Sequence, residues 1–180
     1  MNKIFYHGAI SSIIKLKVYP MSNALEPSNT APDFAAVDQD NNPVKLADFA
    51  GRFLVLFFYP KDDTPGCTIE NQEFTAHAAQ FTEVDAAVVG VSRDDCASHR
   101  AFIEKFGLNV TLLADTAGEL CESYGVWQEV ERDGQKSMRI VRSTFVINPQ
   151  GQLAHVEYGL KDVKGHAAKI LQFIKSQQGG

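Results

Sequence analysis

A continuous run of apolar and aromatic residues from 53 to 59 constrains the fold of this 180-residue chain more than any other segment. The run is too short for a core helix, but its length and its aromatic content are typical of a fully buried strand. Pro60 follows directly and ends the strand. We therefore expect residues 53–59 to form the central strand of a sheet.

The pattern downstream of this run alternates between helix and strand. Apolar side chains repeat with helical spacing within residues 68–81, and either Asp94 or Asp95 can cap a later helix. The other predicted elements are strands at residues 86–91, 110–113, 140–147 and 153–158, a helix at residues 117–124, and a last helix that Asp162 caps. With a hairpin predicted at residues 34–46, this order indicates an α/β, thioredoxin-like fold: a central mixed β-sheet flanked by helices, with an N-terminal β-hairpin.

Charge and composition narrow the range of partners. The net charge of −5 and the lack of a Lys/Arg-rich run argue against a nucleic acid or an anionic membrane surface as partner. No apolar run in the sequence approaches the roughly 20 residues that span a bilayer. The five histidines have no metal-ligand spacing, and we expect each to be a surface or capping residue. We therefore expect a protein that acts on small molecules or other proteins without a metal or another cofactor.

The three cysteines, Cys67, Cys96 and Cys121, are too few and too widely spaced for a disulfide framework, and none belongs to a Cys-x-x-Cys pair. A reducing compartment suits such a chain best, so we expect it in the cytoplasm.

The N-terminal segment has a different composition. The first 25 residues lack Asp and Glu but contain lysines, which is a weak sign of a targeting segment. We interpret residues 1–28 as an N-terminal extension, either inert or a misassigned leader before Met21, and residues 29–178 as one thioredoxin-like domain.

Cys67 stands where a predicted helix begins, directly after Thr64, Pro65 and Gly66. A thiol reacts as its thiolate, and a helix N-terminus lowers the pKa of a thiol from a free value of about 8.5. Backbone N–H groups of such a loop can also converge on an anion or an oxygen atom. A cysteine can equally be a small apolar core residue, so position alone assigns no reaction to Cys67.

The neighbours of Cys67 form a longer pattern. Residues 59–68 read Tyr-Pro-Lys-Asp-Asp-Thr-Pro-Gly-Cys-Thr and contain Pro-x-x-x-Thr-x-x-Cys, the active-site pattern of peroxiredoxins. The run resembles most closely the peroxiredoxin Q or bacterioferritin comigratory protein group, and the resemblance extends from Phe34 to about Ile174. It implies that Cys67 is the peroxidatic nucleophile, Thr64 a hydroxyl that hydrogen-bonds the peroxide, Arg142 the cation beside the thiolate, and Pro60 a shield. By composition alone, Arg142 would be an ordinary surface cation.

The resemblance also implies the reaction. A thiol-dependent peroxidase of this group would reduce hydrogen peroxide and small organic hydroperoxides through a sulfenic acid on Cys67, which thioredoxin, glutaredoxin or a low-molecular-weight thiol would recycle. Two alternatives use the same residues: a thiol–disulfide oxidoreductase, which the missing Cys-x-x-Cys disfavours, and a redox-sensing binding protein that Cys67 oxidation switches. We expect a monomer or a weak homodimer.

The sequence leaves the second thiol of the cycle open. Many relatives in this group carry a resolving cysteine where this chain has Gln72, and others carry it at the position of Ile103. This chain has Cys96 instead, seven residues before Ile103 and hence on nearly the same helical face. Cys96 is therefore a candidate resolving cysteine, Cys121 is expected to be a packing residue, and a one-cysteine cycle with an external thiol is the default.

Overall fold

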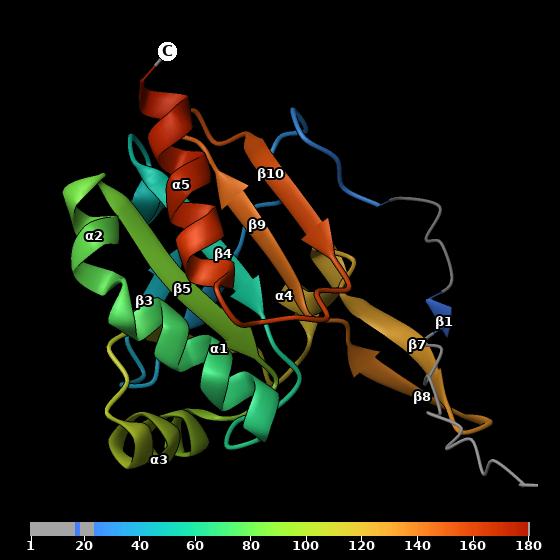
Figure 1. The fold of residues 1–180 in the computed structure, drawn as a ribbon. Coiled ribbons are helices and arrows are strands. Elements are labelled where there is room, and N and C mark those ends of the chain that lie inside the picture. The colour runs from blue at the N-terminus through green and yellow to red at the C-terminus, as the bar shows by residue number, and fades with distance from the viewer. Residues whose placement is uncertain (1–16, 19–23, 180) are drawn as a thin grey trace, which may run out of the picture.

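The strand predicted at residues 53–59 is β4 (Phe53–Phe58), and it lies in the middle of a five-stranded sheet (Figure 1). The computed structural model describes residues 17–18 and 24–179. The other strands of this sheet are β5 (Ala86–Ser92), β6 (Thr111–Ala114), β9 (Ser143–Ile147) and β10 (Leu153–Tyr158), in the order β10-β9-β4-β5-β6. β4, β5 and β6 are parallel, and β9 and β10 are antiparallel to their neighbours. The expected mixed sheet is confirmed.

Both faces of β4 are buried because its side chains alternate between two cores. Val55 and Phe57 pack toward one set of helices, which are α1 (Pro65–Ala76), α2 (Ala78–Glu83), α3 (Cys96–Phe106) and α5 (His166–Gln178). Leu54, Leu56 and Phe58 pack toward α4 (Glu119–Ser123) and the N-terminal hairpin. This hairpin consists of β2 (Ala35–Val37) and β3 (Pro43–Lys45). A short 3-10 helix, η1 (Leu46–Phe49), follows β3. Figure 1 shows α1, α2 and α5 in front of the sheet and α4 behind it. The expected hairpin and flanking helices are thus confirmed.

The single helix predicted at residues 68–81 is wrong, because two helices meet at His77. α1 starts earlier than expected, at Pro65, whose fixed φ and missing N–H suit the first helical position. His77 has φ −100° and ψ 3°, and its ring nitrogen Nδ1 lies 2.8 Å from the carbonyl oxygen of Glu73. The ring thus contacts a carbonyl of the last helical turn, and the chain changes direction before α2 (Figure 1).

The single strand predicted at residues 140–147 is wrong as well. β8 (Gln135–Ile140) ends before Val141 and Arg142, and β9 begins only after them. β8 pairs antiparallel with β7 (Trp127–Arg132) in a hairpin that was not predicted, because most β8 side chains are exposed and carry no apolar alternation. The break leaves Arg142 outside both strands.

The last helix begins later than the predicted cap. Asp162 accepts a hydrogen bond from the backbone N–H of Lys164 at 3.0 Å, but the residue that precedes α5 is Gly165. Gly165 has φ +73°, a conformation that glycine adopts without strain, so the prediction that Asp162 caps this helix is wrong. Ile170 and Ile174 of α5 are fully buried, as the apolar stripe of this helix requires.

The turn between β2 and β3 covers the outer edge of β6. Asp38 forms an isolated antiparallel bridge with Leu113, and the side-chain oxygen Oε1 of Gln39 accepts a hydrogen bond from the N–H of Leu112 at 3.0 Å. Arg100 of α3 donates to the carbonyl oxygen of Gln39 at 2.9 Å and so holds the turn in place.

Most of the N-terminal extension lies outside the described residues. Two of its residues form β1 (Lys17–Val18), which pairs antiparallel with β7. The boundaries at residues 1–28 and 29–178 therefore stay predictions. Within the described ranges, no helix has the length and apolar character needed to cross a membrane.

Candidate active site

The structure places Cys67 in the first turn of α1, at its third residue. Thr64 is the extended residue before the helix, and Pro65 and Gly66 are its first two positions. The thiol is only 1% exposed. Because the first N–H groups of a helix have no partner within it and the positive end of the helix dipole lies there, this position stabilises a thiolate.

Arg142 contacts the thiol of Cys67 although the two residues are far apart in the sequence. Its Nη2 donates to Sγ of Cys67 at 3.2 Å, across 75 residues of sequence. The break between β8 and β9 turns Arg142 out of the sheet, and its carbonyl oxygen accepts a hydrogen bond from the N–H of Leu160 at 2.9 Å. The fold therefore brings a fixed cation next to Cys67.

The Arg142 guanidinium lies between two ionisable groups, the Cys67 thiol and the Glu70 carboxyl. Glu70 lies one turn after Cys67 on α1, is fully buried, and forms an ion pair with Nη1 of Arg142. Burial raises the pKa of Glu70 to about 7, although the Arg142 guanidinium opposes the shift. Burial alone would lower the pKa of Arg142, but Glu70 and the Cys67 thiolate raise it above its usual value, so Arg142 stays charged. Glu70 was not predicted as a site residue, although its spacing of three from Cys67 puts both on one helical face.

Thr64 and Pro60 stand on the loop that leads into α1. The Thr64 hydroxyl donates to the carbonyl oxygen of Lys61 at 2.9 Å, which leaves the lone pairs of the hydroxyl oxygen for another donor. Pro60 is exposed and directly follows the buried Tyr59 at the end of the sheet. The loop thus brings a hydroxyl and a proline ring to the same end of the sheet as Cys67.

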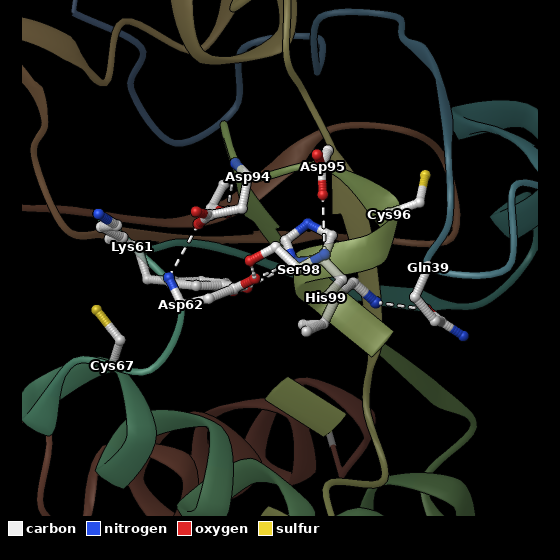
Figure 2. Close-up of polar contacts among 12 residues, drawn as sticks. Gln39, Lys61, Asp62, Cys67, Asp94, Asp95, Cys96, Ser98 and His99 are labelled. Atoms are coloured by element: carbon white, nitrogen blue, oxygen red, sulfur yellow. Dashed lines mark hydrogen bonds and ion pairs between the residues drawn. The ribbon is translucent and has the colours of Figure 1, made fainter. Parts of the chain in front are cut away.

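All three cysteines are free. Cys96 is the first residue of α3, is half-buried, and its thiol donates to the carbonyl oxygen of Asp38 at 3.2 Å. Figure 2 shows the Cys96 sulfur pointing away from Cys67, with the side chains of Asp62 and His99 between the two cysteines.

Cys121 is fully buried, and burial raises the pKa of its thiol far above the ordinary value, so it stays protonated. Cys121 is thus placed as the packing residue that was expected.

Two histidines contradict the expectation of surface or capping positions. His99 is 0% exposed, with Nδ1 2.8 Å from Asp62 and Nε2 3.1 Å from the carbonyl oxygen of Leu113. His166 is also buried, and burial lowers its pKa to about 4. The polar partners of these two histidines lie far away in the sequence, so local spacing could not predict them. His7 lies outside the described residues.

The described part of the chain holds no group of three or more His, Cys, Asp and Glu residues that could bind a metal ion.

Comparison with known proteins identifies the family of this chain. The sequence profile of the AhpC/TSA family matches residues 27–156. Peroxiredoxin Bcp of Bacillus subtilis (strain 168) is 40% identical over 151 residues, which cover 84% of this chain and 96% of that protein. Peroxiredoxin Bcp of Escherichia coli (strain K12) is 35% identical over 153 residues, which cover 85% of this chain and 97% of that protein. The structure of Xanthomonas campestris peroxiredoxin Q superimposes with a TM-score of 0.75 at 36% identity, covering 79% of this chain and 90% of that one. The chain therefore belongs to the AhpC/TSA family and is a peroxiredoxin, a thiol-dependent peroxidase.

Proposed function

We propose that Cys67 is the peroxidatic cysteine of this enzyme and that Arg142, Thr64 and Pro60 assist it. The contact between Nη2 of Arg142 and Sγ of Cys67, 3.2 Å long at the start of α1, is the observation that carries the proposal. A cation and a helix N-terminus together favour the thiolate, which is the reactive form.

In the proposed first step, the Cys67 thiolate attacks one oxygen of the peroxide. A sulfur–oxygen bond forms as the oxygen–oxygen bond breaks, and the departing oxygen takes up a proton, so that the products are a sulfenic acid and water or an alcohol. Negative charge moves from sulfur to the departing oxygen during this step. Donors along that line therefore stabilise the transition state more than the ground state.

Each assisting residue has a distinct role in this proposal. Arg142 stabilises the thiolate and then the developing negative charge, because its guanidinium stays charged beside the sulfur. Thr64 receives a hydrogen bond from the peroxide, since its own hydroxyl proton is directed to Lys61. Pro60 covers the loop from the solvent side, which suits its exposed position after Tyr59.

The sulfenic acid is then reduced in two thiol steps. A first thiol displaces water and forms a disulfide with Cys67, and a second thiol releases Cys67 and is itself left in a disulfide. We propose an external thiol for the first step, because the Cys96 thiol is hydrogen-bonded to the carbonyl oxygen of Asp38 and points away from Cys67 (Figure 2). Cys96 remains the candidate resolving cysteine of a cycle in which the start of α3 unwinds.

The substrates and partners follow from the same reasoning. We propose hydrogen peroxide and small organic hydroperoxides as substrates, with thioredoxin, glutaredoxin or a low-molecular-weight thiol as the reductant. A structure of Xanthomonas campestris bacterioferritin comigratory protein is described in terms of its alkyl peroxide reduction activity, which supports the inclusion of organic hydroperoxides. We also propose a cytoplasmic monomer or weak homodimer, with residues 29–178 as its catalytic domain.

One oxidation experiment tests the cysteine assignments. The reduced protein is treated with one equivalent of hydrogen peroxide, the free thiols are blocked, and mass spectrometry determines the state of each cysteine. Oxygen on Cys67 alone supports the one-cysteine cycle, and a bond between Cys67 and Cys96 would replace it with an intramolecular cycle. An unmodified Cys67, or full peroxide turnover by Cys67→Ser, would refute the proposal.

A further inference from the structure

A partly buried polar network joins the loop before α1 to α3 (Figure 2). We call it the Asp62 network, and its members are Tyr59, Asp62, Asp94, Ser98 and His99. The Asp62 carboxylate accepts hydrogen bonds from the Tyr59 hydroxyl at 2.6 Å, from the Ser98 hydroxyl at 2.7 Å and from Nδ1 of His99 at 2.8 Å. Asp62 is 6% exposed, so its carboxylate exchanges solvent for three fixed donors.

The hydrogen-bond partners of Asp62 keep its side chain ionised. His99 links Asp62 to β6, because its Nδ1 lies 2.8 Å from the Asp62 carboxylate and its Nε2 lies 3.1 Å from the carbonyl oxygen of Leu113. Burial opposes ionisation of Asp62, but the hydrogen bonds from His99, Tyr59 and Ser98 outweigh it and lower the pKa of Asp62. Asp62 is therefore a carboxylate, and hydrogen bonds to a charged acceptor are roughly twice as strong as neutral ones. The Asp62 side chain consequently has one well-defined position.

The backbone transmits this position to Thr64. The N–H of Asp62 donates to Oδ2 of Asp94 at 2.9 Å, and the same oxygen accepts from the Ser92 hydroxyl at 2.6 Å. The carbonyl of Lys61, which belongs to the same peptide group as that N–H, accepts the Thr64 hydroxyl at 2.9 Å. Because a peptide group is planar, holding its N–H also fixes the direction of its carbonyl. The orientation of the Thr64 hydroxyl thus depends on Asp62 and Asp94.

We propose that Asp62 and Asp94 are positioning residues for peroxide reduction, which fix the peptide group between Lys61 and Asp62 and thereby orient the Thr64 hydroxyl beside Cys67. This inference rests on the role proposed above for Thr64 and deepens it. A network that served only to stabilise the fold would affect every reaction of Cys67 alike. A positioning role affects only the reaction that uses the Thr64 hydroxyl.

Two substitutions at Asp94 separate these readings. Asp94→Ala removes the acceptor of the Asp62 N–H, whereas Asp94→Asn keeps an oxygen within reach of it. We expect Asp94→Ala to slow Cys67 oxidation by hydrogen peroxide by on the order of 10-fold to 100-fold, as for a displaced catalytic group, and Asp94→Asn to restore most of the rate. Alkylation of Cys67 by iodoacetamide does not use Thr64 and should keep its rate. Asp63→Asn is the matched control, since Asp63 is the exposed neighbour of Asp62 and pairs with Lys105 instead.

The Thr64→Val background completes the test. Asp94→Ala should slow peroxide oxidation in the wild type but add no further loss in Thr64→Val, because both changes remove the same interaction. Equal losses in both backgrounds, parallel losses in peroxide oxidation and alkylation, or no rescue by Asp94→Asn would overturn the inference. If Thr64→Val is slow while Asp94→Ala is not, only the positioning role fails. If Thr64→Val is as fast as the wild type, the role of Thr64 fails together with it. Should Asp94→Ala not fold, Asp62→Asn takes its place in the same measurements.

Discussion

Replacing Arg142 by methionine should slow the reaction of Cys67 with peroxide on the order of 10²-fold to 10³-fold. The change removes a cation that lies 3.2 Å from the sulfur while keeping a side chain of similar length. Two unit charges about 4 Å apart interact by about 4 kcal/mol at the effective dielectric constant of a partly exposed site. A lost transition-state donor costs about 2.7–4 kcal/mol by mutagenesis elsewhere, which corresponds to the same range of rates. Both estimates describe the loss of one fixed donor next to an anion, and both give the same order of magnitude.

The buried Glu70 carboxyl loses its ion-pair partner in Arg142→Met, which could disturb the site independently of Cys67. The Glu70 side chain is 1% exposed, so removing Arg142 leaves a buried carboxyl without its ion pair. Burial already raises the pKa of Glu70 to about 7 with Arg142 present, and loss of the guanidinium raises it further. At neutral pH the carboxyl therefore takes up a proton, and no unpaired charge remains buried in the variant.

The assay is a rapid mixing of reduced protein with peroxide, quenched at intervals and read as oxygen on Cys67 by mass spectrometry. Arg139→Met is the matched control, because Arg139 is exposed on β8 and donates to Ser137 rather than to the active site. We expect Arg139→Met to keep the wild-type rate constant. A wild-type rate constant for a folded Arg142→Met would refute the role of Arg142, while the family assignment would stand.

Three further outcomes follow from the structure. Glu70→Gln removes a group whose pKa is raised from 4.5 to about 7, so the wild type should lose stability relative to the variant as pH rises through that window, measured by urea unfolding. Gly90→Ala places a methyl 2.7 Å from Phe57 and 2.8 Å from Leu112, so the free energy of unfolding should fall by about 1–3 kcal/mol; an unchanged urea midpoint would contradict this packing. Cys96→Ser should leave turnover with a low-molecular-weight thiol unchanged, and loss of that turnover would assign Cys96 as the resolving cysteine.

The sequence predicts the elements that are buried by apolar side chains. β4 is recognisable because both of its faces are covered and every residue is apolar. The β7–β8 hairpin is not recognisable, because its stability comes from backbone pairing while its outer strand stays exposed and polar. Apolar spacing also does not reveal the break at His77, where a side chain contacts the backbone of the preceding turn.

Some residues of the candidate site could be predicted from the sequence, and others could not. Cys67 and Thr64 are close in sequence and form a local pattern, so they could be predicted together. Arg142 was predicted only through a family resemblance, since its contact with Cys67 spans 75 residues. Asp62 and His99 were missed because they lie 37 residues apart, and buried polar residues that satisfy one another leave no periodic signal.

The turn that covers β6 has a consequence for solubility. An uncovered edge strand offers free N–H and C=O groups to any other strand, and such edges are starting points for aggregation. Here Asp38 and Gln39, in the turn between β2 and β3, pair with the outer edge of β6. The Cys96 thiol donates a hydrogen bond to the carbonyl oxygen of Asp38 in this turn. Loss of the hydrogen bond between the Cys96 thiol and Asp38 would loosen this cover, so the protection of the β6 edge depends in part on one side chain at the start of α3.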